Sequence, residues 1–88
     1  MEIDNRVKDH LSMALNEDWK RFGMEILHDN DIKRIDMDHR SVYEKCFEML
    51  NQWEKKSEVP VNIGMVMQVL LKLRRNDIWS SLQESKCF

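Results

Sequence analysis

The chain has 88 residues, enough for one domain with a modest core, because a chain this short buries only about 60% of its unfolded surface. It carries 14 basic and 16 acidic side chains, for a net charge of −2. Nucleic-acid binding requires a surplus of cations on one face, so we expect no nucleic acid as a partner. Two glycines and one proline among abundant Leu, Met, Lys, Glu and Asp favour helices, so we predict an all-α fold.

Apolar residues at three- and four-residue steps predict a first helix over about residues 3–15. Residues 16–18, NED, have the pattern of an N-cap followed by acidic residues in a first turn, so a second helix is expected over about residues 17–27. Gly23 falls in the interior of this second helix, where a glycine costs roughly 1 kcal/mol. Its presence predicts that another helix approaches closely there.

Residues 28–40 are mostly polar and predict only a short third helix of about two turns, capped by Asp29 or Asn30. Residues 36–40 are expected to form a polar connection to the next helix. The apolar residues that this segment offers to a core are Ile32, Ile35 and Met37.

The longest uninterrupted helical pattern runs over residues 41–56. Its two adjacent apolar rows make a face wider than a coiled-coil seam, so we expect a central helix that packs against several others. Ser41 and Glu44 have the spacing of a capping box at its start. The two rows consist of Val42, Cys46, Met49 and Trp53, and of Tyr43, Phe47 and Leu50.

Pro60 interrupts the helical pattern, and Asn62 is a good N-cap for a fifth helix. Arg74 and Arg75 are expected in its last turn, where cations interact favourably with the helix dipole. The following Asn-Asp pair starts a final helix. Six helices joined by short links predict a compact bundle.

The two cysteines do not suggest a disulfide framework, since Cys46 lies on the apolar face of the central helix and Cys87 is one residue from the end. This usage fits a reducing compartment. No apolar run approaches the roughly 20 residues that span a membrane, and the polar N-terminus does not resemble a signal peptide. We therefore expect a cytoplasmic protein, or the cytoplasmic part of a larger one, with no membrane insertion.

The sequence offers little to support catalysis. The three histidines fall in separate segments without cysteines or carboxylates at metal-ligand spacing, so we expect no metal site and no cofactor. Cys46 with His39 is a conceivable nucleophile pair, but the apolar surroundings of Cys46 favour a buried, inert thiol. We predict no enzyme activity and no small-molecule substrate. A small helical DNA-binding domain is an alternative, although no helix presents a basic, base-reading face.

The chain resembles a death domain of the death-fold superfamily in four ordered segments: EDWKRFGMEIL, DNDIKRID, VYEKCFEMLNQWEKK and MVMQVLLKLRRNDIWSSL. The resemblance covers about residues 5–84 and implies that residues 1–88 form a single death domain. It also implies an antiparallel six-helix bundle with Greek-key topology. The core residues that it implies are Trp19, Ile32, Ile35, Leu50, Trp53, Leu70, Ile78 and Leu82.

Some positions depart from the family pattern. Asn16 stands where family members often have glycine, and Leu27-His28 replaces a common Leu-Gly pair, so these two turns are expected to differ in shape. The central segment and the ending DIWSSL are most similar to the domains of receptor-interacting kinases and their adaptors. Caspase-recruitment and death-effector domains are the nearest structural alternatives, but Trp19 and Trp53 favour the death domain proper.

The resemblance implies a homotypic interaction module that binds other death-fold domains and brings kinases or caspases together in apoptotic, NF-κB or innate-immune signalling. It implies three types of contact, each between different surfaces of two domains. The first type would pair Arg21, Asp29, Asp31, Lys33 and Arg34 with Lys8, Glu44, Glu48 and Lys55. The second would pair residues of the central helix with Arg74, Arg75 and Asp77. The third would set Asp36, Asp38 and Arg40 against neighbouring corners.

Overall fold

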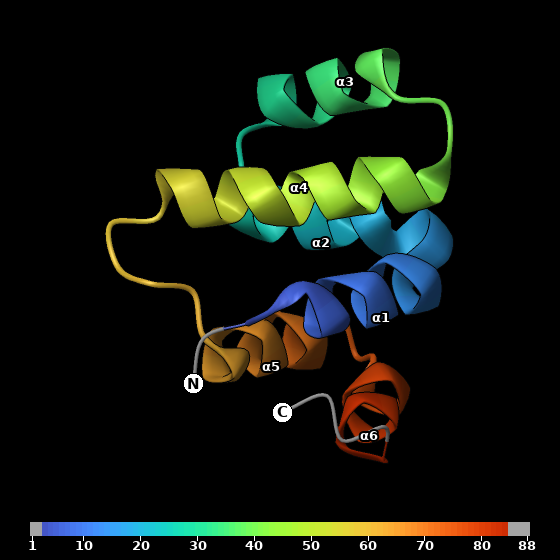
Figure 1. Ribbon diagram of the computed structural model, residues 1–88, viewed down its shortest axis with the longest axis vertical. Helices are drawn as coiled ribbons and strands as arrows, with labels where there is room; N and C mark the ends of the chain where they lie inside the picture. The colour runs from blue at the N-terminus through green and yellow to red at the C-terminus, as the bar shows by residue number, and fades with distance from the viewer. Residues whose placement is uncertain (1–2, 85–88) are drawn as a thin grey trace.

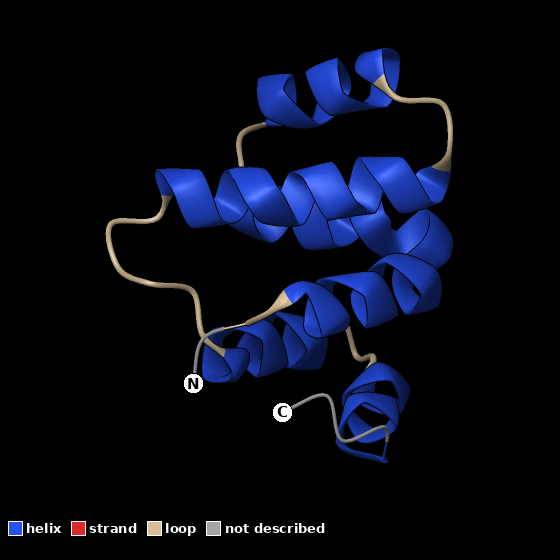
Figure 2. Cartoon of the chain, viewed as in Figure 1, coloured by secondary structure: helices blue, strands red, loops and turns tan. Residues whose placement is uncertain are grey.

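The computed structural model describes residues 3–84, which form six α-helices and one 3-10 helix, so the all-α prediction is confirmed (Figures 1 and 2). Cys87 lies outside the described residues. In chain order the elements are α1 (Asn5–Leu15), η1 (Asn16–Asp18), α2 (Trp19–Ile26), α3 (Asp29–Asp38), α4 (Val42–Lys56), α5 (Ile63–Lys72) and α6 (Asn76–Glu84).

Helix α4 is the central helix, as its long apolar pattern predicted. It packs against α1, α2 and α3, with α3 on one side and α1 on the other in Figure 1. Four of its apolar residues, Cys46, Met49, Leu50 and Trp53, are buried. Tyr43 is 40% exposed and Phe47 is half-buried, contrary to the prediction of two buried rows. The buried face of α4 is therefore narrower near its N-terminus than expected.

All eight residues that the resemblance placed in the core are buried, as are residues of α1 such as Leu11 and Leu15. The Phe22 and Trp53 rings meet edge to face, with centroids 5.7 Å apart and planes at 72°, a favourable arrangement for an aromatic pair. The predicted close approach at Gly23 is also confirmed. A Cβ at this position would lie 2.3 Å from Cδ1 of Ile32, so only glycine lets α3 pack here without a shift.

The predicted start of the second helix was wrong. Asn16 adopts φ 48° and ends α1, a conformation that asparagine tolerates better than most residues, and it does not cap α2. Residues 16–18 then form a 3-10 turn, whose last bond runs from the Trp19 N–H to the Asn16 carbonyl. Helix α2 consequently begins at Trp19, two residues later than predicted.

The third helix is longer than predicted, since α3 continues through residues that were expected to form a connection. The N-cap of α3 is His28, where Asp29 or Asn30 was predicted. The His28 side chain makes no capping hydrogen bond. Asp36 in the last turn pairs with Lys45 of α4 and Lys20 of α2, at 2.6 and 3.1 Å, and these bonds hold the turn against the bundle. Met37 points outward and is 85% exposed, so it does not belong to the core.

The predicted caps of α4 and α5 are confirmed. The Ser41 hydroxyl accepts a hydrogen bond from the Glu44 N–H at 3.1 Å, and Asn62 Oδ1 accepts one from the Met65 N–H at 3.0 Å. Each side chain satisfies one of the amides that a helix start leaves without an intrahelical partner. The Glu44 carboxylate, the other half of the expected capping box, lies 4.0 Å from His39 Nδ1.

Arg74 and Arg75 were predicted to lie in the last turn of α5. They lie beyond it, because α5 ends at Lys72. Arg74 adopts φ 59°, and its N–H donates to the Leu71 carbonyl at 3.0 Å. The Arg75 N–H donates to the Leu70 carbonyl at 2.9 Å. This pair of bonds is the Schellman arrangement, which here occurs with arginine in the position that usually holds glycine.

Candidate interaction surfaces

The charged side chains on the surface of the bundle differ in whether another residue of the chain already pairs with them. Asp36 bridges three helices through Lys20 and Lys45, and the hydrogen bond from Lys45, together with that from Lys20, lowers the pKa of the Asp36 carboxyl below its ordinary value. Asp31 pairs with Lys56 at 2.7 Å, and this bond likewise lowers the pKa of Asp31. Both aspartates, predicted as contact residues, thus have partners inside the monomer.

Lys8, which was predicted to contact a partner, has partners within the chain. Its side chain is buried between α1 and α4, where Nζ pairs with Glu54 and donates to Asn51 Oδ1 at 2.9 Å. Nζ also lies 6.0 Å from the centroid of the Phe47 ring. The sequence pattern missed this role because it does not show that Asn51 and Glu54 face α1.

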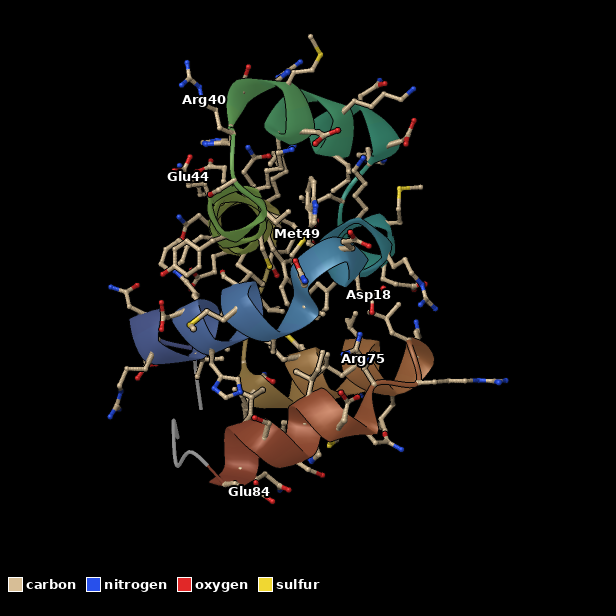
Figure 3. The ribbon with its side chains drawn as sticks, turned by 90° about the vertical axis from the view of Figure 1, so that its right-hand side faces the viewer. Asp18, Arg40, Glu44, Met49, Arg75 and Glu84 are labelled. Carbon is tan, nitrogen blue, oxygen red and sulfur yellow. The ribbon has the colours of Figure 1, made fainter. Side chains whose placement is uncertain are left out.

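Arg75 belongs to an ion-pair network between the start of α2 and the turn from α5 to α6. Its guanidinium pairs with Asp77, with Nε 3.0 Å from Oδ1, and with Asp18 (Figure 3). The hydrogen bonds with Asp77 and Asp18 raise the pKa of Arg75, and the bond from Arg75 lowers the pKa of Asp77. Arg21 lies 3.7 Å from the same Asp18. Arg21, Arg75 and Asp77, all predicted as contact residues, therefore form ion pairs with Asp18 or with each other.

On the outer side of α3, Lys33 pairs with Asp29 at 3.1 Å across one helical turn. Both side chains are exposed, and such a pair contributes little to stability and opens easily. Arg34, the next residue, is exposed. Within residues 3–84, five exposed candidates make no ion pair: Arg34, Asp38, Arg40, Lys55 and Arg74.

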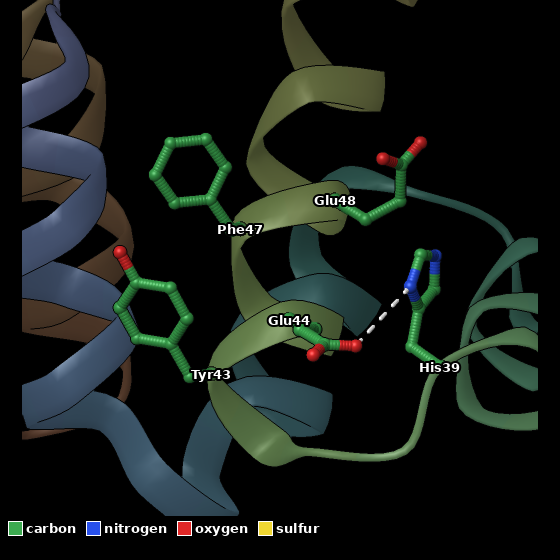
Figure 4. A pocket seen from close by; sticks show the side chains of 5 residues that line it. All are labelled: His39, Tyr43, Glu44, Phe47 and Glu48. Atoms are coloured by element: carbon green, nitrogen blue, oxygen red, sulfur yellow. Dashed lines mark ion pairs between the residues drawn. The ribbon is translucent and has the colours of Figure 1, made fainter.

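A surface pocket lies beside the N-terminal half of α4, and we call it the α4 pocket. Tyr43 and Phe47 form one side, with ring centroids 5.9 Å apart, and Glu44, Glu48 and His39 form the other (Figure 4). The Tyr43 hydroxyl donates a hydrogen bond to Asp9 of α1, which raises the pKa of the phenol.

The sequence predicted Glu44 and Glu48 as surface residues but assigned the two aromatic residues to the core. The polar link at residues 39–41, just before Tyr43, was the available signal that this end of α4 lies at the edge of the bundle.

The thiol of Cys46 is not available as a nucleophile. Cys46 is buried, its thiol donates to the Leu11 carbonyl at 3.9 Å, and burial raises its pKa to about 12. The thiolate needed for nucleophilic attack is therefore almost absent at neutral pH. Within residues 3–84 no group of three or more His, Cys, Asp or Glu is placed to hold a metal ion, and no helix is long and apolar enough to cross a membrane.

The described chain is thus a small bundle of helices with charged side chains over its surface and a buried cysteine. Residues 4–86 match the family model of the Death domain, so the chain belongs to the death domain family. Its bundle of six helices is the fold of that family, whose members are non-catalytic, homotypic interaction modules of apoptotic and inflammatory signalling. Comparisons with curated proteins and with solved structures gave no match.

Proposed function

We propose that this death domain binds other death-fold domains in the cytoplasm, as the assembly module of a signalling adaptor, receptor or kinase. The domains assembled in this way would bring kinases or caspases close together in an apoptotic, NF-κB or innate-immune pathway. The similarity of the central segment and the DIWSSL ending to the domains of receptor-interacting kinases and their adaptors supports this choice of pathway proteins.

The observation that carries the proposal is the set of exposed charges without an ion-pair partner in the described chain. Arg34 and Arg40 lie on and just after α3, whereas Arg74 lies at the turn before α6. In Figure 3 Arg40 lies near the top of the bundle, whereas Arg75, the neighbour of Arg74, lies in its lower half. Charged groups on separate faces allow contacts between unlike surfaces, which need not close into a ring and therefore can extend to many copies.

Binding to a panel of purified death-fold domains, together with light scattering over a concentration series at low salt, tests this proposal. We expect binding to at least one adaptor or receptor-interacting kinase domain, weakened by Arg34→Glu and by Arg74→Glu. Each reversal removes a cation that no residue of the described chain neutralises. Arg6→Glu is the matched control, because it makes the same charge change at an exposed residue that pairs with Asp4 and lies outside the predicted contacts. Absence of both self-association and binding across the panel would refute the proposal.

A further inference from the structure

The α4 pocket combines an aromatic wall with an acidic one. The Tyr43 and Phe47 rings form the aromatic wall and are inclined at 33° to each other. Glu44 and Glu48, one helical turn apart, lie on the opposite side of the pocket (Figure 4). Such a site suits a guanidinium group, whose flat face stacks on aromatic rings while its N–H groups donate to carboxylates.

No residue of the described chain supplies that guanidinium. The Glu48 carboxylate accepts a hydrogen bond from Gln52 at 3.4 Å, and Glu44 lies 4.0 Å from the His39 ring. Arg40 directly follows His39, a residue that lines the pocket, and it is exposed. Figure 3 shows Arg40 and Glu44 on the same side of the molecule, but no ion pair joins them within residues 3–84.

We propose that this face binds a second copy of the same chain, with Arg40 of each copy entering the α4 pocket of the other. A two-fold axis brings a surface against itself, so a cation and an acidic pocket on one face can form the same contact twice. The pocket has two carboxylates, and the adjacent Arg40 forms no ion pair with the described residues, which makes this face complementary to its own copy.

This contact differs from those of the proposed function, because a two-fold contact closes after two copies and cannot extend. The pocket is open and its lining is small, so we expect a weak, transient dimer. Formation of the dimer would occupy Glu44 and Glu48, and it would therefore compete with any other death-fold domain that binds this part of α4.

Sedimentation equilibrium of the purified chain over a concentration series at low salt provides the test. The Arg74→Glu variant, which removes a charge at the turn between α5 and α6, should retain the dimer even where it reduces larger assemblies. Arg40→Glu and Glu48→Arg should each raise the dissociation constant of the dimer by about tenfold or more. The double variant Arg40→Glu/Glu48→Arg should restore dimerisation, since it exchanges the signs of the two partners.

Lys55→Glu is the matched control, because Lys55 is an exposed cation at the other end of the same helix and forms no ion pair within residues 3–84. It should leave the dimer unchanged, and thermal melting should show that every variant is folded. A monomer at all concentrations would overturn the inference, as would a dimer that survives both single reversals or a double variant that stays monomeric. The panel of death-fold domains tests the proposed function separately, so failure of one does not imply failure of the other.

Discussion

Trp53 joins α4 to α2 through its edge-to-face contact with Phe22, and it is buried. Trp53→Ala removes a large apolar side chain and leaves a cavity, so we expect a loss of about 3–5 kcal/mol in the free energy of unfolding. That is a large part of the 5–15 kcal/mol typical of a domain. Urea denaturation measures the change, and Trp53→Phe, which keeps an aromatic ring, should cost less. An unchanged midpoint for Trp53→Ala would contradict the packing described here.

Cys46 should react slowly with thiol reagents, because its side chain is buried and its pKa is raised to about 12. At neutral pH almost all of the thiol is protonated, and between pH 7 and 9 the slow labelling rate should rise about tenfold per pH unit without levelling off, because the thiolate fraction stays small below a pKa of about 12. The measurement is modification by a chromogenic disulfide in a Cys87→Ser variant, with and without denaturant. Rapid labelling of the native protein would show that Cys46 is accessible.

At the scale of single elements, Gly23 determines how closely α3 approaches α2. Gly23→Ala gains helix propensity worth up to about 1 kcal/mol, but its Cβ would lie 2.3 Å from Cδ1 of Ile32 and 3.0 Å from the Met49 sulfur. Overpacking typically costs about 1–3 kcal/mol, so we expect a net loss of stability. Ile32→Val deletes the clashing methyl group, and the cost of Gly23→Ala should be smaller in that background. A double-mutant cycle by urea denaturation measures the coupling, and additive effects would contradict it.

Asp36 joins α3 to α2 and α4 through two lysines, and its pKa in the folded protein lies below the ordinary value of 3.8. Because the pKa of this carboxyl is lower in the folded state than in the unfolded state, its ionised form stabilises the folded protein. This stabilisation is complete above the unfolded-state pKa and is lost as the pH falls through the folded-state pKa. Asp36→Asn should therefore destabilise the domain at neutral pH, with a difference that shrinks below pH 3.8. Urea unfolding across this range measures the difference. A constant cost at all pH values would show that the charge of Asp36 is not responsible.

Helix ends were predictable where a side chain forms the cap and not where the backbone does. Ser41 and Asn62 accept hydrogen bonds from amides three residues later, and both caps were predicted from residue type. Asn16 and Arg74 adopt positive φ, which residue type indicates reliably only for glycine. The end of α5 and the start of α2 were consequently misplaced by a few residues.

At the scale of the whole molecule, binding to partners and folding should respond differently to salt. The exposed charges that form no ion pair in the described part of the chain, such as Arg34 and Arg74, are screened by salt, so association should weaken by roughly tenfold or more between low and high ionic strength. The melting temperature should change by only a few degrees, because the core is apolar and surface ion pairs contribute little. Parallel binding and melting titrations with salt test this. Binding that is insensitive to salt would point to an apolar interface instead.

The candidate site was less predictable than the fold. Of the charged residues proposed from the resemblance, Lys8 is buried, and Asp31 and Asp36 pair with lysines of other helices. Glu54 lies 46 positions from Lys8 and Lys56 lies 25 positions from Asp31, so local spacing gave no sign of these pairs. The α4 pocket was missed for a different reason: its residues lie close together in sequence, but Tyr43 and Phe47 were assigned to the core because they are apolar.

The sequence by itself determined the helical class, the central position of α4, the eight core residues and the death domain family, because periodic burial and residue type are recorded locally along the chain. Only the tertiary structure decided which charges face solvent without a partner. Ion pairs such as Lys56 with Asp31 form between helices that meet only after folding. Availability for a partner is a property of the packed surface, and the packing brings together residues that are distant in sequence.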